Sequence, residues 1–137
     1  MRTPSATDGC RVLVADDHPL IVRLLRRSLE DAGCYVAVET AADRVAQAVA
    51  REQVELAIID ANMKPCDRFH ALRAVRELAA ERPPAIILLS GDDSVAVRQR
   101  ALELGADAFL AKPWDPDELL QVVERLVRDV RSKAGRV

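Results

Sequence analysis

The sequence has no apolar stretch that approaches the roughly 20 residues required by a membrane-spanning helix. It also has no basic excess, since 20 lysines and arginines stand against 22 acidic residues, and this argues against direct contact with nucleic acid. Its three cysteines form no CxxC pair, and no signal-type segment opens the chain, so reduced thiols are expected. These absences predict a soluble cytoplasmic protein with no membrane or direct nucleic-acid contact.

The glycine-rich phosphate loops of nucleotide-binding enzymes are missing too, because neither GxGxxG nor GxxxxGK occurs. The chain has 137 residues, and 50% of them are hydrophobic, which is enough for one domain with an ordinary core. The expected organisation is a flexible N-terminal segment over 1–9, a domain over 10–131 and a tail over 132–137.

Short apolar runs alternate along the chain with amphipathic segments. The runs predict strands over 11–15, 35–38, 56–59, 85–89 and 108–111, and three of them are apolar at nearly every position, as in parallel strands covered on both faces. The segments between and after them predict helices over 19–32, 42–51, 69–81, 95–104 and 116–131. Five repeated strand–helix units with right-handed crossovers predict an α/β fold with a doubly wound five-stranded parallel sheet.

Polar residues stand where four of these strands end. Ligands of doubly wound sheets bind at the carboxyl ends of the strands, so this edge is expected to collect Asp16, Asp17, Asp60, Ser90 and Lys112. Carboxylates about 5 Å apart repel by roughly 3 kcal/mol per pair at an effective dielectric constant of 20, so a nearby positive charge is required. Carboxylate oxygens suit Mg²⁺. Lys112, one of only three lysines, provides a second, compact charge.

An aspartate beside a divalent cation and an ammonium group is a plausible nucleophile toward phosphorus, because a carboxylate can accept a phosphoryl group as a mixed anhydride. Such a protein modifies itself and is not an enzyme in the usual sense. The chemistry predicted for this edge is therefore transfer of a phosphoryl group onto the protein.

The ordered set of motifs resembles the receiver domain of two-component response regulators over about residues 10–131. The resemblance rests on Asp16-Asp17, on Asp60-Ala61-Asn62-Met63, on Ser90-Gly91 and on Lys112-Pro113, with Ser90 lying 30 and Lys112 lying 52 residues beyond Asp60. It implies the flavodoxin-like (βα)5 fold with strand order 2-1-3-4-5, and a signalling role in a two-component system or phosphorelay.

Residue roles follow from the resemblance alone. It implies that Asp60 is the phosphoacceptor, that Ser90 and Lys112 contact the phosphoryl group, and that Ser90 and Phe109 form a switch. The implied Mg²⁺ ligands are Asp16 (mainly through water), Asp17, Asp60 and the backbone carbonyl of Asn62. Pro113 is expected to follow a cis bond, as is common in the family. The implied phosphoryl donor is a sensor histidine kinase or a histidine phosphotransfer protein.

The implied partner surfaces lie on the helices. The face formed by the segments 95–104, 108–111 and 116–131, with Arg98, Arg100 and Glu103, is expected to bind a downstream protein. Leu20 and Val22 on the helix over 19–32 are expected to contact the kinase. Asn62 and Asp92, two residues beyond Asp60 and Ser90, are of the kind that helps hold an attacking water during self-dephosphorylation.

The loop after Asp60 departs from the family pattern. The family has a proline directly after the methionine and a glycine four residues later, whereas here Pro65 comes one residue late and Arg68 stands at the glycine position, where a positive φ is expected. Lys64 and Arg68 also add positive charge. A rearranged loop in a working receiver and a degenerate, phosphorylation-independent interaction module both remain open.

Two further alternatives concern how the protein passes on its signal and to which class of protein it belongs. The chain is expected to be either a single-domain regulator that signals by binding or the N-terminal part of a longer regulator with an output domain. Metal-dependent phosphohydrolases also use an aspartate nucleophile at a strand end, but they place a second aspartate two residues later, where this chain has Asn62.

Overall fold

A computed structural model describes residues 7–78 and 81–134. The parallel strands are β1 (Arg11–Ala15), β2 (Tyr35–Glu39), β3 (Leu56–Asp60), β4 (Ala85–Ser90) and β5 (Ala108–Ala111). The helices are α1 (Pro19–Asp31), α2 (Val45–Glu52) after a 3-10 turn (Ala42–Arg44), α3 (His70–Arg76), α4 (Val95–Glu103) and α5 (Pro116–Ala134). Residues 1–6 of the predicted flexible segment and 135–137 of the predicted tail lie outside the described residues. Thr7 is buried and its hydroxyl donates to the Ala32 carbonyl at 2.7 Å, and α5 continues to Ala134, past the predicted start of the tail at residue 132.

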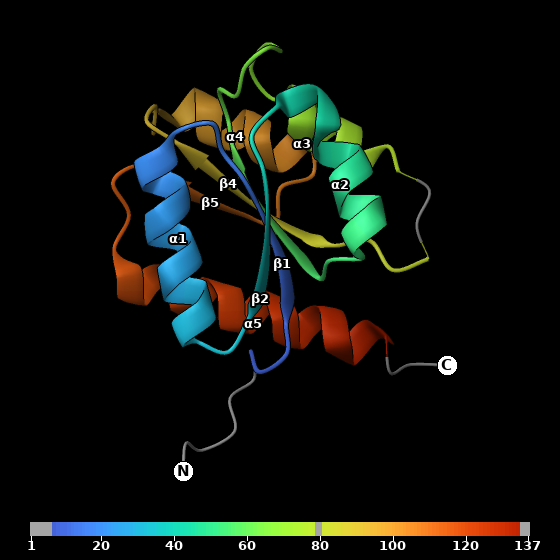
Figure 1. Ribbon diagram of the computed structural model, residues 1–137. Helices are drawn as coiled ribbons and strands as arrows, with labels where there is room; N and C mark the ends of the chain where they lie inside the picture. The colour runs from blue at the N-terminus through green and yellow to red at the C-terminus, as the bar shows by residue number, and fades with distance from the viewer. Residues whose placement is uncertain (1–6, 79–80, 135–137) are drawn as a thin grey trace.

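The five strands form one sheet in the order β2-β1-β3-β4-β5, which confirms the predicted fold. Helices cover both faces of this sheet (Figure 1). Two buried clusters lie on its two sides, one packed against α2, α3 and α4 and the other against α1 and α5. The carboxyl ends of all strands consequently meet at one edge.

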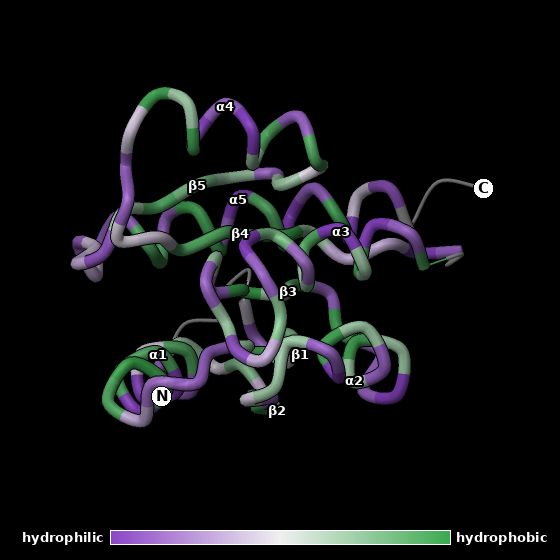
Figure 2. The backbone as a smooth tube through the Cα atoms, turned by 90° about the horizontal axis from the view of Figure 1, so that it is seen from above, coloured by the Kyte–Doolittle hydropathy of each residue, from purple (hydrophilic) through white to green (hydrophobic). Residues whose placement is uncertain are grey.

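Alternating strand residues supply the two halves of the core. In β1, Leu13 belongs to the cluster on the α2 side, whereas Val12 and Val14 belong to the cluster on the α1 side. The strands β3 and β4 alternate in the same way, so no polar face remains in the centre of the sheet, where the tube is hydrophobic in Figure 2. Their continuous apolar sequences therefore reflect burial on both faces.

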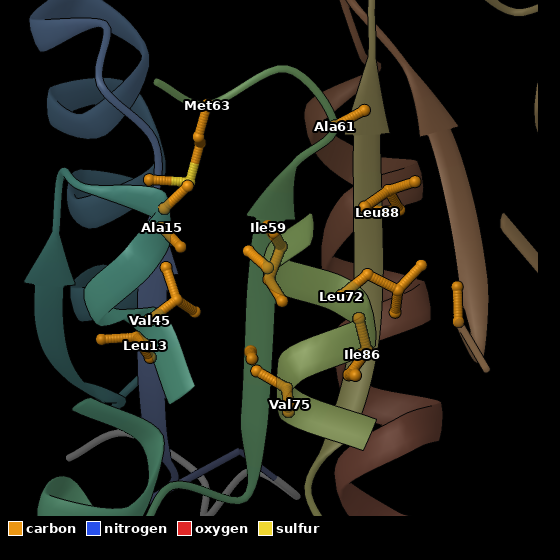
Figure 3. Close-up of a cluster of buried hydrophobic side chains, with 14 of the residues drawn as sticks. Leu13, Ala15, Val45, Ile59, Ala61, Met63, Leu72, Val75, Ile86 and Leu88 are labelled. Atoms are coloured by element: carbon orange, nitrogen blue, oxygen red, sulfur yellow. The ribbon is translucent and has the colours of Figure 1, made fainter. Parts of the chain in front are cut away.

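The loop after β3 is anchored to this core. Met63 is 2% exposed and reaches down from the loop toward Ala15 and Val45 (Figure 3). Because Met63 is buried in the core, the first residues of this loop are held against the sheet.

The helix α3 is shorter than predicted. It begins at His70, since Phe69 has a left-handed backbone (φ 69°), and it ends at Arg76 although the sequence predicted a helix to residue 81. Pro83 and Pro84 precede β4, and a proline disfavours helical backbone in the residue before it. This restriction limits a helix only near residue 82 and does not account for its end at Arg76. Most other element bounds agree with the sequence to within three residues.

The α5 N-terminus has the cap that its sequence predicted. The Asp115 carboxylate accepts hydrogen bonds from the backbone N–H groups of Asp117 (2.8 Å) and Glu118 (3.3 Å), and Pro116 occupies the first helical position. No described helix combines the length and the apolar character that crossing a membrane requires.

The left-handed backbone of Gln53, at the end of α2, allows a test of how conformation affects stability. Gln53 ends α2 in a left-handed conformation (φ 51°, ψ 54°), which disfavours residues with a Cβ. We expect Gln53→Gly to raise the free energy of unfolding by about 0.5–1 kcal/mol in urea denaturation. The matched variant Ala50→Gly, inside the same helix, should lower it by about 1 kcal/mol. A loss of stability in Gln53→Gly would contradict this reading of the helix end.

Candidate functional site

Three carboxylates converge at the carboxyl edge of the sheet. Asp16 and Asp17 directly follow β1, and Asp60 is the last residue of β3, the neighbouring strand. One oxygen from each of the three carboxylates lies within 4.8 Å of the others. The parallel topology thus brings together acidic residues that are 44 positions apart in the chain.

Lys112 follows β5 and reaches across β4 into the same corner. Its Nζ donates to Asp16 Oδ2 at 3.0 Å and lies 3.2 Å from Asp60 Oδ1. Burial alone would lower the pKa of Lys112, but the hydrogen bond to Asp16 and the two negative charges outweigh it and raise the pKa. The ammonium group is therefore firmly charged at neutral pH.

Asp16 and Asp17 have different surroundings although they are adjacent. Asp16 is 1% exposed, and its second oxygen accepts a hydrogen bond from the backbone N–H of His18 at 2.9 Å. Asp17 is exposed and accepts from the backbone N–H of Lys64 at 3.2 Å, and no described lysine or arginine forms an ion pair with it. Asp16 is thus built into the structure, whereas Asp17 is accessible to a ligand.

Asp60 is held through one of its two oxygens. Its Oδ1 accepts from the backbone N–H of Asn62 at 3.3 Å and makes the short contact with Lys112, so Oδ2 is the less engaged oxygen. Burial and the charge of Asp16 raise the pKa of Asp60, and these effects outweigh the opposing influence of Lys112. The surroundings of Asp60 therefore favour its ionised form less than water does.

Ser90 and Phe109 lie on the neighbouring strands. Ser90 ends β4 and is fully buried, and its Oγ accepts from the backbone N–H of Asp92 at 3.0 Å. Phe109 is 7% exposed within the core cluster on the α2 side, and the Arg98 guanidinium lies 4.8 Å from its ring centroid. The structure thus places Ser90 at the same edge as the carboxylates and turns Phe109 inward.

The loop after β3 corrects one expectation. The positive φ falls on Phe69 and not on Arg68. Phe69 lies four residues after Pro65, so the late proline shifts the left-handed position by one residue with it. Both Lys64–Pro65 and Lys112–Pro113 are cis, as the resemblance implied for the second of these bonds.

Arg68 makes contacts that the sequence did not predict. Its Nε donates to Asn62 Oδ1 at 3.2 Å, and its Nη1 lies 3.5 Å from Asp92 Oδ2. The sequence indicated only a positive charge near the site. The two contacts depend on the path of the shifted loop, for which no short motif gives a signal.

The donor set fits a hard divalent cation. Three carboxylates meet one ammonium group, which leaves an excess of two negative charges when all are ionised, and all three side chains offer oxygen. Such a set suits Mg²⁺, which binds through one or two carboxylates and retains water. The residues present thus fit a magnesium ion at Asp16, Asp17 and Asp60.

Comparison with known sequences identifies the family. The family model described as "Response regulator receiver domain" matches residues 12–124. The transcriptional regulatory protein PcoR of Escherichia coli is 32% identical over 127 residues, which cover 93% of this chain and 55% of PcoR. A 14.6 kDa protein of Leptolyngbya boryana is 36% identical over 114 residues, which cover 83% of this chain and 87% of that protein. The chain thus spans about half the length of PcoR and of GltR from Pseudomonas aeruginosa.

Solved structures show the same architecture. The BeF3-activated receiver domain of RstA from Klebsiella pneumoniae has a TM-score of 0.78 and 26% identity, covering 86% of this chain and 98% of that one. The receiver domain of NarL from Mycobacterium tuberculosis has a TM-score of 0.79 and 27% identity, covering 94% and 99%. The receiver domain of the histidine kinase PA1611 from Pseudomonas aeruginosa, with 23% identity and a TM-score of 0.78 over 87% and 98% of the chains, shows the likeness of fold alone. That structure has a magnesium ion coordinated in its active-site cleft.

Receiver domains bind Mg²⁺ in their acidic pocket and interact with histidine kinases or phosphotransfer proteins, and this chain has the acidic cluster in the corresponding fold. Fold, cluster and sequence agree, and the chain belongs to the response regulator receiver domains of two-component signal transduction.

Proposed function

We propose that Asp60 accepts a phosphoryl group from a histidine kinase or a histidine phosphotransfer protein. The observation that supports this most directly is the asymmetry of the carboxylate, whose Oδ1 is held by Lys112 and by the backbone of Asn62. In the proposed step, Oδ2 forms a bond to phosphorus while the bond between phosphorus and the donor breaks, and the donor nitrogen keeps that electron pair. Lys112 offsets the negative charge of the incoming oxygens.

Mg²⁺ would be held by Asp17, Asp60 and the Asn62 backbone carbonyl, with Asp16 acting mainly through water. When bound, it supplies positive charge that lets an anionic phosphoryl donor approach the carboxylates. Asp16 keeps Lys112 in place through the 3.0 Å contact, and the exposed Asp17 provides the open side of the site.

The output would pass through Ser90 and Phe109. Ser90 Oγ, which accepts from Asp92 N–H, would turn to the phosphoryl group, and the Phe109 ring would move with it beneath Arg98. The face of α4, β5 and α5, which includes Arg98, Arg100 and Glu103, is the proposed surface for a downstream protein. Leu20, 53% exposed on α1, and its neighbour Val22 form the proposed kinase contact.

Two other functions make different predictions for this site. The shifted loop after Asp60 is the one feature that also fits a degenerate receiver, which would bind partners without phosphorylation. A phosphohydrolase would need an acid two residues after the nucleophile, and the amide of Asn62 cannot donate a proton in that way. Output through a further domain is proposed only as an alternative to direct binding of a target.

The proposal is tested by chemical phosphorylation. We expect incubation with Mg²⁺ and acetyl phosphate to add one phosphoryl group to the wild type and none to Asp60→Ala, as measured by intact mass. Asp67→Ala removes an exposed acid (side chain 81% exposed) from the same loop and should be modified like the wild type. No gain of mass in the wild type would favour the phosphorylation-independent module. Repeated turnover of phosphate esters would favour the hydrolase.

Magnesium binding should appear as a thermal shift. A ligand that binds only the folded state stabilises it by about 2.7 kcal/mol at 100 times its dissociation constant. We expect saturating Mg²⁺ to raise the Tm of the wild type and to have little effect on Asp17→Asn, because the exposed carboxylate is lost. Asp67→Asn is the control and should respond fully. An unchanged response of Asp17→Asn would remove Asp17 from the proposed ligands.

A further inference from the structure

Arg68 connects the two loops that flank the acceptor. Its Nε binds the Asn62 side chain in the loop after β3, and its Nη1 contacts Asp92 in the loop after β4. The backbone N–H of Asn62 binds Asp60, and that of Asp92 binds Ser90. Arg68 therefore contacts neither Asp60 nor Ser90 but holds the residue two positions after each of them.

We propose that Arg68 is a positioning residue that prolongs the phosphorylated state by keeping the Asp92 carboxylate from assisting a water molecule. This inference rests on the proposed phosphorylation of Asp60. The inference is specific to this chain, because Arg68 lies in the loop after β3 whose late proline departs from the sequence pattern of the family.

Hydrolysis of an aspartyl phosphate is assisted by a proton acceptor near the attacking water. The water oxygen forms a bond to phosphorus, the bond between phosphorus and the Asp60 oxygen breaks, and the products are the free Asp60 carboxylate and inorganic phosphate. The water loses a proton in this process, so an adjacent carboxylate speeds it. Among the described residues that Arg68 joins, Asp92 is the stronger acceptor, because the amide of Asn62 carries no charge.

Both oxygens of Asp92 are engaged in the structure. Its Oδ1 accepts from the backbone N–H of Ser94 at 3.0 Å, and its Oδ2 faces Arg68. These hydrogen bonds and the charge of Arg68 lower the pKa of Asp92, which makes it a weaker base. The Asn62 amide oxygen, the second acceptor beside the site, also points to Arg68. The guanidinium thus occupies both acceptors at once.

The exposure of the bridge limits the size of the effect. The Arg68 and Asp92 side chains are 41% and 43% exposed, so their attraction is weak and is screened by salt. We expect a change of about two- to fivefold in the dephosphorylation rate, the size that corresponds to one exposed charge pair.

The experiment measures the decay of the phosphorylated protein. Wild type, Arg68→Ala and Arg73→Ala are phosphorylated with acetyl phosphate and Mg²⁺, the donor is removed by desalting, and the phosphorylated fraction is followed by intact mass. Arg73 pairs with an exposed acid, Asp67, at 3.6 Å and has a side chain 43% exposed, so it is a matched control. We expect Arg68→Ala to decay about two- to fivefold faster than the wild type, and Arg73→Ala to decay at the wild-type rate.

Further variants separate positioning from a general loosening of the loop. Arg68→Lys keeps a charge near Asp92 but loses the forked contact, so its rate should be intermediate. The double variant Arg68→Ala/Asp92→Ala removes the acceptor that the single variant releases and should return toward the wild-type rate. Added NaCl should accelerate decay in the wild type more than in Arg68→Ala.

Two results would overturn the inference while leaving the proposed function intact. The first is that Arg68→Ala is phosphorylated normally but its phosphorylated form decays no faster than that of the wild type. The second is that the phosphorylated double variant decays as fast as phosphorylated Arg68→Ala. Absence of phosphorylation in the wild type would instead count against the proposed function itself.

Discussion

The position of Lys112 between Asp16 and Asp60 is the interaction on which the functional edge depends. Asp16 is 1% exposed, and the side chain of Asp60 is 10% exposed. Without the lysine, these two buried carboxylates would repel each other strongly. The lysine lies 3.0 and 3.2 Å from them and so permits the two strand ends to approach. Because one ammonium cannot neutralise three carboxylates, the corner retains an attraction for a further cation. The chemistry at Asp60 follows from this incomplete compensation.

The sheet and the loops have different roles at the functional edge. Strands β1, β3 and β4 are buried on both faces and hold the acidic corner and the hydroxyl of Ser90 at fixed positions. The loops after β3 and β4 are more exposed and carry Asn62, Arg68 and Asp92, which differ from the strand-end residues in making weak, solvent-screened contacts. Rigid elements thus define the acceptor, whereas the loops can adjust how long it stays modified.

The acidic corner could be predicted from the residues themselves, because polar residues interrupt apolar strands at their carboxyl ends, whereas the sheet order was predicted only from the resemblance to receiver domains. Asp60 and Ser90 end buried runs, and parallel topology alone brings such ends together. Details of the loop after β3 were not predictable in this way. The left-handed position lies on Phe69, one residue later than the sequence predicted, and α3 ends at Arg76, for which no sequence pattern gives a signal. The Arg68 contacts join two loops whose relative placement no local pattern encodes.

The central claim is that the corner is under-compensated without a metal ion, and the free energy of unfolding of Asp60→Asn tests it most directly. With a chelator present, the variant should be more stable than the wild type by about 1 kcal/mol, because roughly 3 kcal/mol of repulsion per close pair is partly offset by the lost attraction to Lys112. Saturating Mg²⁺ should then stabilise the wild type more than the variant. A variant that is less stable than the wild type in chelator would show that Lys112 already compensates the corner, and would contradict the claim.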